Sequence, residues 1–250
     1  MSLFKDVAVT LRRIDYSETS QVVELFSREQ GKQRLIAKGI KRSTRKRVAP
    51  GIDLLENGQA VWSRREGSEA SLGLLTDWRQ LDAFTGLRER LDRLYGAQYA
   101  VEVVSLLTED GDPHPPLYDD LVRTLTSLSG ADNSLEHVVT FQLSILREVG
   151  LLPSFSNCVA CGRPASGRHQ AYLSSTAGGL LCPNCEPAQV EKRRATAKAI
   201  AGLIGQPWTP AGLTGAFDLL DYHIAYTIGR STRLGPWVVP PARRAESAGA

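Results

Sequence analysis

The spacing of apolar residues changes near Asp82, and this change limits the folds open to the 250-residue chain. Before it, apolar and polar residues alternate, as at Val7, Val9 and Leu11, which is the period of a half-buried strand. After it, apolar residues recur every three or four positions, as on one face of a helix. We therefore expect an α+β protein in which a strand-built domain over residues 1–80 precedes a helical domain over residues 81–238.

The first domain is expected to contain five or six short strands. Asn57-Gly58 is a strong hairpin signal, because both residues tolerate the positive φ of a two-residue turn. No helical pattern in this part is long enough to cross over between parallel strands. These features predict a small antiparallel barrel. The expected strands cover residues 7–11, 22–26, 32–38, 52–55, 59–64 and 71–75.

The second domain is expected to be a bundle of helices interrupted by an irregular insert. Ser134 is a candidate N-cap for one helix, and the tail over residues 239–250 is expected to be disordered. The expected helices cover residues 87–107, 116–128, 134–149, 195–204 and 214–230, and the insert covers residues 151–193.

All four cysteines of the chain lie in the insert, in two C-x2-C pairs separated by twenty residues: Cys158, Cys161, Cys182 and Cys185. This spacing favours a zinc ribbon over residues 153–190, with the four thiolates holding one structural Zn²⁺ and leaving no position for water or substrate. Two disulfides are the alternative, but no secretory signal accompanies the cysteines. A redox-active C-x2-C pair is also disfavoured, because thioredoxin-type motifs occur beside a βαβ pattern that this chain lacks.

Positive charge is concentrated between Arg28 and Arg47. Nine basic residues and one acid give this stretch a net charge of +8, whereas the whole chain has only +3. Such a concentration attracts a polyanion. The alternative is a solvated surface or a disordered basic arm, but apolar residues inside the stretch indicate that its first half forms strands. The candidate phosphate-binding residues are Lys32, Arg34, Lys38, Lys41, Arg42, Arg45, Lys46 and Arg47.

Catalytic and membrane signatures are missing from the sequence. There is no phosphate-binding P-loop, no G-x-S-x-G and no H-E-x-x-H, and the acidic pairs are better explained as helix caps than as metal ligands. No signal peptide and no apolar run of membrane-spanning length is present. We expect a cytoplasmic protein that is not an enzyme.

Two sets of motifs occur together along the chain. The first set is Tyr16-Ser-Glu18, Val22-Val-Glu-Leu-Phe26-Ser-Arg-Glu29-Gln-Gly31 and Ala37-Lys38-Gly39-Ile-Lys41-Arg42. The second set is Gly150-Leu-Leu-Pro153 before the first cysteine pair, and Tyr172-Leu-Ser174 with Gly178-Gly-Leu-Leu-Cys182 before the second. Together these motifs resemble the RecO family of bacterial recombination mediators and DNA repair proteins, and the resemblance covers residues 5–230 in order.

This resemblance implies an OB-fold, then a helical domain with a zinc ribbon, and a non-enzymatic role near the bacterial nucleoid. The family binds single- and double-stranded DNA, anneals complementary strands and, with RecR, helps RecA replace single-strand-binding protein. The positive face of the family's OB-fold matches the eight basic candidates. The acidic C-terminal tail of single-strand-binding protein would dock on the helical domain, with Arg123 and Arg147 as candidate contacts.

Base stacking is expected to be weak in this chain. The first domain offers few aromatic residues, so binding should depend mainly on phosphates and tolerate any base sequence. A zinc-ribbon RNA-binding or transcription factor remains an alternative, because a basic loop and a ribbon would serve it equally well. A metal-dependent nuclease is a third, but it would need clustered carboxylates that the first fifty residues lack. The aromatic residues are Phe4, Tyr16, Phe26, Trp62 and Trp78.

Overall fold

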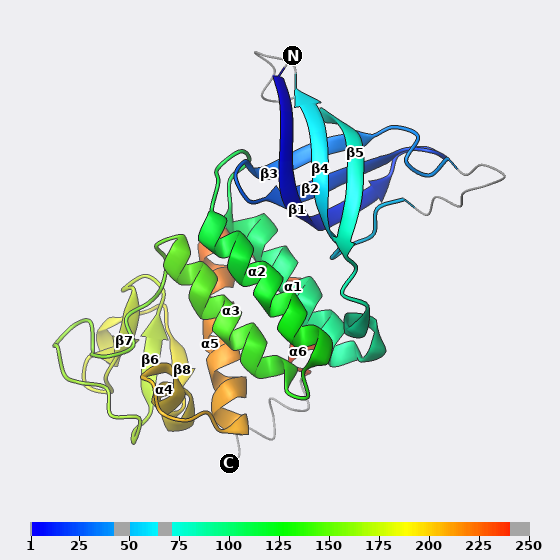
Figure 1. The fold of residues 1–250 in the computed structure, drawn as a ribbon. Coiled ribbons are helices and arrows are strands. Elements are labelled where there is room, and N and C mark those ends of the chain that lie inside the picture. Colours follow the sequence, from blue (N-terminus) through cyan, green and yellow to red (C-terminus); the bar gives the residue numbers. More distant parts are fainter. Residues whose placement is uncertain (1, 43–50, 65–71, 241–250) are drawn as a thin grey trace. The chain divides into compact units, whose positions relative to one another are not determined.

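The computed structural model describes residues 2–42, 51–64 and 72–240. Five strands come first and helices dominate the rest, as the change of period predicted (Figure 1). The chain divides into two compact units, residues 1–89 with 104–130, and residues 90–103 with 131–250. No helix in the described part of the chain has both the length and the apolar character needed to span a membrane.

The five N-terminal strands close into a barrel in the order β1-β2-β3-β5-β4. All neighbours are antiparallel except β3 and β5, which pair in parallel at Leu35–Gly73 and the next two positions. The strands are β1 (Ser2–Asp15), β2 (Gln21–Ser27), β3 (Gly31–Ala37), β4 (Asn57–Arg64) and β5 (Gly73–Asp82).

Alternation places one face of each strand in the barrel core. Val23 and Leu25 on β2, and Leu35 and Ala37 on β3, are buried two residues apart. The register of β1 shifts between Thr10 and Arg12, so Val9 and its neighbours on both sides are buried and the simple alternation expected there is broken.

Two expectations about the strands are wrong. Residues 52–55 form no strand: Leu54 and Leu55 lie in a turn, and Gly51 and Leu55 have φ of 90° and 71°, outside the range of a strand. Ile52 still joins the core, which explains the apolar signal. Asn57-Gly58 forms the start of β4 and does not form a hairpin turn. Glycine is required at position 58 because an added Cβ would lie 2.5 Å from the ring of Trp78.

Helical residues complete the first unit. A short 3-10 helix η1 (Thr85–Glu89) precedes α1 (Leu91–Leu107), and α2 (Pro115–Gly130) follows. The hydroxyl of Tyr118 on α2 donates to the side chain of Asn57 at 2.8 Å. The guanidinium of Arg28 binds Asp119 through two hydrogen bonds of 2.9 Å. These contacts make α2 part of the same compact unit as the barrel.

The second unit contains the first part of α1 and four further helices. Tyr99 lies at its centre, fully buried, with its hydroxyl donating to Asp221 at 3.0 Å and accepting from Gln142 at 2.7 Å. Ser134 is not the N-cap that we expected: Asn133 occupies that position, and the Ser134 hydroxyl donates to Asp92. The helices are α3 (Ser134–Glu148), α4 (Ala197–Leu203), α5 (Pro210–Ile228) and α6 (Gly235–Val238).

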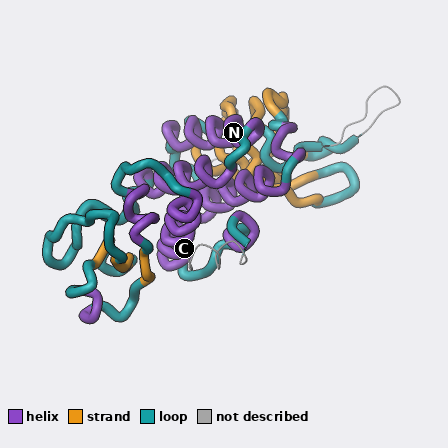
Figure 2. Tube along the Cα trace, turned by 90° about the horizontal axis from the view of Figure 1, so that it is seen from below, coloured by secondary structure: helices purple, strands orange, loops and turns teal. Residues whose placement is uncertain are grey.

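Capping explains why α5 begins earlier than its apolar pattern indicated. Thr209 accepts from the N–H of Gly212, Pro210 has no N–H to lose, and Gly229 ends the helix in the left-handed conformation. The insert before it contains a small sheet of order β7-β6-β8. Figure 2 shows this part of the chain as loop with short strands: β6 (Ala171–Ser174), β7 (Gly179–Leu181) and β8 (Arg193–Ala195), with a 3-10 turn η2 (Glu186–Ala188).

Candidate metal centre and nucleic-acid interface

The four cysteine sulfurs lie together in the second unit. All are within 4.8 Å of one another, and the sulfurs of Cys161 and Cys182 are 3.8 Å apart. A tetrahedral Zn²⁺ with Zn–S bonds of about 2.3 Å would set its sulfurs about 3.8 Å apart. A disulfide needs about 2.05 Å, and all four cysteines are free thiols. The donor set therefore fits a zinc ion.

Two backbone turns position the sulfurs. Gly162, with φ of 72°, closes the first turn by donating to the carbonyl of Cys158 at 2.8 Å. In the second, Cys185 and Glu186 donate to the carbonyl of Cys182, each at 3.0 Å. Burial raises the pKa of Cys158, but backbone N–H donors outweigh it and bring the pKa to about 6. Such donors stabilise thiolates, the form that binds metal.

Polar contacts with α5 hold the insert in place. Glu191 accepts from the Ser174 hydroxyl at 3.0 Å, from the Thr176 N–H at 2.9 Å and from the Tyr222 hydroxyl. Although burial raises the pKa of Glu191, these donors lower it overall. His223 donates through Nε2 to the carbonyl of Leu151 at 2.8 Å.

The basic stretch does not act as one surface. Lys32 is 6% exposed, and its ammonium donates to the carbonyls of Ser105 at 2.9 Å and Thr108 at 2.6 Å. Asp110 lies 3.5 Å from the same ammonium. Lys32 therefore has a packing role, and its expected contact with phosphate stays a prediction.

Carboxylates accompany two more of the candidates. Arg34 is exposed but has Glu24 at 3.6 Å and Asp110 at 3.4 Å. Lys41 pairs with Asp15 at 3.0 Å, and this hydrogen bond lowers the pKa of Asp15. Surface pairs of this kind are weak and exchange partners readily.

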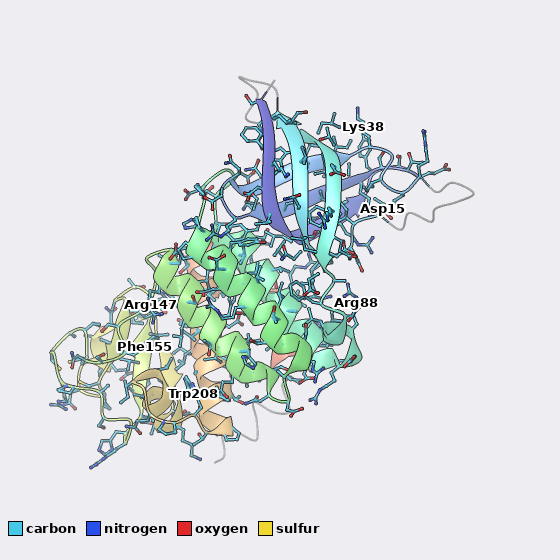
Figure 3. All side chains as sticks on the ribbon, viewed as in Figure 1. Asp15, Lys38, Arg88, Arg147, Phe155 and Trp208 are labelled. Carbon is cyan, nitrogen blue, oxygen red and sulfur yellow. The ribbon has the colours of Figure 1, made fainter. Side chains whose placement is uncertain are left out.

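Lys38 and Arg42 are exposed, and no carboxylate of a described residue lies within ion-pair distance of either. Figure 3 labels Lys38 beside the barrel strands. Arg45, Lys46 and Arg47 lie outside the described residues. Among the described residues of the basic stretch, Lys38 and Arg42 are therefore the candidates that are exposed and have no carboxylate partner.

A cavity of about 370 Å³ opens beside these two cations. It lies between the β1–β2 turn and the residues that follow β3. Strand pairing explains the position: Gln21, the first residue of β2, pairs with Asp15 on one side and Ala37 on the other. The cavity is lined by Tyr16, Ser17, Thr19, Ser20, Ile36, Lys38, Gly39 and Arg42.

The β1–β2 turn lines the cavity although the charge pattern of the sequence did not predict a role for it. The signal was available, because a strand that pairs with both neighbours brings the end of the first strand beside the end of the third. Composition alone predicted a role for the basic residues but none for the hydroxyl groups of the turn.

Arg123 and Arg147 are both on helix surfaces. Arg123 on α2 has a 70% exposed side chain that pairs with Asp120 one turn earlier. Arg147 on α3 is exposed. They belong to different compact units.

Two family models match the chain: Recombination protein O N terminal over residues 1–84, and Recombination protein O C terminal over residues 88–234. The chain belongs to the RecO family. A RecO relative from Anaeromyxobacter sp. (strain Fw109-5) is 32% identical over 244 residues, covering 98% of this chain and 88% of the relative. One from Myxococcus xanthus (strain DK1622) is 31% identical over 240 residues, covering 92% and 94%. Both RecO relatives are named DNA repair protein RecO.

Proposed function

We propose that this chain acts in DNA repair and recombination as a non-enzymatic DNA-binding mediator. It binds single- and double-stranded DNA through the barrel and anneals complementary strands. The observation that carries the proposal is the pair of cations without described carboxylate partners, Lys38 and Arg42, at a cavity of the barrel. Family membership supports the repair role, because the relatives are named for it.

The barrel is assigned to the OB-fold. Its five strands in the order β1-β2-β3-β5-β4, with the parallel β3–β5 pair, support this assignment. OB-folds bind oligonucleotides with the face of strands 2 and 3 and the loops after strands 1 and 4. The β1–β2 turn, which is the loop after strand 1, lines the cavity, and Lys38 follows β3, which supports a ligand site here.

Annealing follows from charge neutralisation. Two DNA strands repel each other, and cations that touch the phosphates of both reduce this repulsion. Contacts to phosphate leave the base edges available for pairing with the other strand.

One Zn²⁺ is proposed for the cysteine cluster, in a structural role. Four cysteine ligands would fill its coordination, so the ion would supply folding energy to the insert and no catalysis. The hydrogen bonds from Tyr222 to Glu191 and from His223 to Leu151 would then join this metal-stabilised segment to α5.

The proposed protein partners are RecR and the C-terminal tail of single-strand-binding protein, with a functional link to RecA loading in the cytoplasm near the nucleoid. Arg123 and Arg147 are the candidate contacts for the acidic tail, because arginine pairs readily with carboxylates. Calorimetric titration of the chain with the tail peptide tests this: no binding at peptide concentrations of tens of micromolar would remove both residues from the proposal.

The test of the main proposal is an annealing assay with complementary oligonucleotides, with and without single-strand-binding protein. Faster annealing by the chain, at a rate that falls with added salt, is expected. A zinc-ribbon RNA-binding factor is the alternative, and it would require discrimination in favour of the 2′-hydroxyl. Equal binding to DNA and RNA strands of the same sequence would argue against that alternative.

A further inference from the structure

We infer that the cavity between the β1–β2 turn and the end of β3 holds one unpaired base of a DNA strand, stacked on the ring of Tyr16. Lys38 and Arg42 bind the phosphates on either side of that nucleotide. This inference rests on the proposed function and adds a base contact to it.

Tyr16 differs from the other aromatic residues of the barrel. It is 68% exposed, whereas Trp62 is buried in the barrel core and Phe26 is buried against Tyr118 of α2. Phe4 stacks on Trp62 with ring centroids 5.6 Å apart, and Trp78 packs against the core. Among the described residues of the barrel, Tyr16 is therefore the aromatic ring open to a base.

The cavity has the chemistry that a nucleotide needs. Its volume of about 370 Å³ is within the roughly 300–1,000 Å³ typical of ligand pockets. Half-buried Ile36 gives it an apolar surface, and the hydroxyls of Ser17 and Thr19 can meet the polar edge of a base. The two cations lie on the same cavity as the ring. Stacking on a flat ring suits any base, because every base has a π-face.

Hydrogen bonds fix the two walls of the cavity to each other. The N–H of Tyr16 donates to the carbonyl of Ser20 at 3.0 Å, which shapes the turn. The Lys41 N–H donates to the carbonyl of Thr19 at 3.1 Å, and the Gly39 N–H donates to the Ser20 hydroxyl at 3.4 Å. The cavity is thus formed before a ligand arrives, which lowers the ordering cost of binding.

Gly39 shapes the wall of the cavity that follows β3. Its φ of 70° belongs to the left-handed region, which glycine adopts without strain. A residue with a side chain would be strained at this position although a Cβ would meet no atom within 4 Å.

The experiment measures the affinity of the full-length chain for a short oligothymidylate, for an abasic strand of the same length and for a duplex. The variants are Tyr16→Ala, Tyr16→Phe and, as a control, Ile14→Ala, which removes an exposed apolar side chain of β1 that does not line the cavity. Circular dichroism and thermal unfolding confirm that each variant is folded.

We expect Tyr16→Ala to weaken oligothymidylate binding about 5-fold to 100-fold, in line with the usual effect of removing one stacking ring. Tyr16→Phe and Ile14→Ala should bind within about twofold of the parent, since the ring or the cavity is kept. Binding to the abasic strand and the duplex should not change, and the salt dependence should stay the same because no charge is removed.

Three results would overturn the inference. If Tyr16→Ala binds oligothymidylate as the parent does, while the parent binds with a clear salt dependence, the base contact is wrong and the proposed DNA binding stands. If the parent binds none of the strands, both fail. An equal loss on the abasic strand would also reject stacking, because that strand has no base to lose.

Discussion

The ammonium of Lys32 lies 2.6 Å from the carbonyl oxygen of Thr108, one residue beyond the end of α1. The last carbonyls of a helix have no partner within the helix, and a cation there also complements the helix dipole. Lys32, the most buried of the described lysines in the basic stretch, therefore stabilises the fold, whereas Lys38, a few residues later, is exposed. Residue type alone does not separate these two roles.

Lys32→Met should lower the free energy of unfolding by ~2–3 kcal/mol, because carbonyls that accept from a charged donor lose it while the apolar stem is kept. Chemical denaturation measures this. Lys38→Met is the matched control and should change stability by less than about 0.5 kcal/mol. Equal stability of the two variants would contradict the internal role of Lys32.

The double variant Lys38→Ala with Arg42→Ala should weaken single-stranded DNA binding at all base sequences alike. Two lost phosphate contacts should flatten the slope of log K against log salt by about 1.4, at roughly 0.7 per contact. The control removes two exposed cations from other strands of the barrel, Lys5 and Arg79. If both double variants show the same loss of affinity and the same change in salt slope, binding depends on the overall charge of the barrel and not on Lys38 and Arg42.

Metal analysis of the purified chain should find about one zinc per molecule. Cys182→Ala should lose the metal and destabilise the second unit by several kcal/mol, since the energy of structural zinc binding is folding energy. Ser156→Ala, an exposed change near the first cysteine pair, should keep the zinc. Purified protein with two disulfides and no metal would refute the site.

Acid should weaken the attachment of the insert to α5. Burial lowers the pKa of His223 below 6.5, so the unfolded chain binds a proton there at a pH where the folded chain does not. Stability from this group is therefore present above pH 6.5 and is lost as pH falls toward the folded pKa, by at most ~1.4 kcal/mol per pH unit. Thermal unfolding between pH 7.5 and 5.5 should show a smaller loss in His223→Gln than in the parent. His137→Gln, on α3, should follow the parent.

Much of the fold could be predicted from the order of the apolar patterns along the sequence. The strands, the main helices and the cysteine cluster follow from local spacing, which depends on near neighbours in the chain. The absence of a strand at residues 52–55 could not be predicted in this way. Ile52 is apolar because it packs in the barrel core, whereas the positive φ of Gly51 and Leu55 prevents a strand. Ser134 looked like a cap because the competing partner, Asp92, is far away in sequence.

The candidate site was predicted less completely than the fold. Counting charges identified Lys38 and Arg42, but it also included Lys32, because burial depends on the segment that packs over a residue. Tyr16 was visible as an aromatic residue, yet its exposure depends on which other rings enter the barrel core. Such facts follow only from long-range packing.

The carbonyls that bind Lys32 have a practical consequence for dividing the protein into fragments. The N-terminal family model ends at residue 84, but Ser105 and Thr108 lie beyond it. A polypeptide cut at the end of the barrel would contain a lysine placed to bind absent acceptors, and Gly31 would lose the backbone of Asp112 that packs against it. The smallest autonomously folding piece that keeps the basic surface should therefore extend through α2, to Gly130.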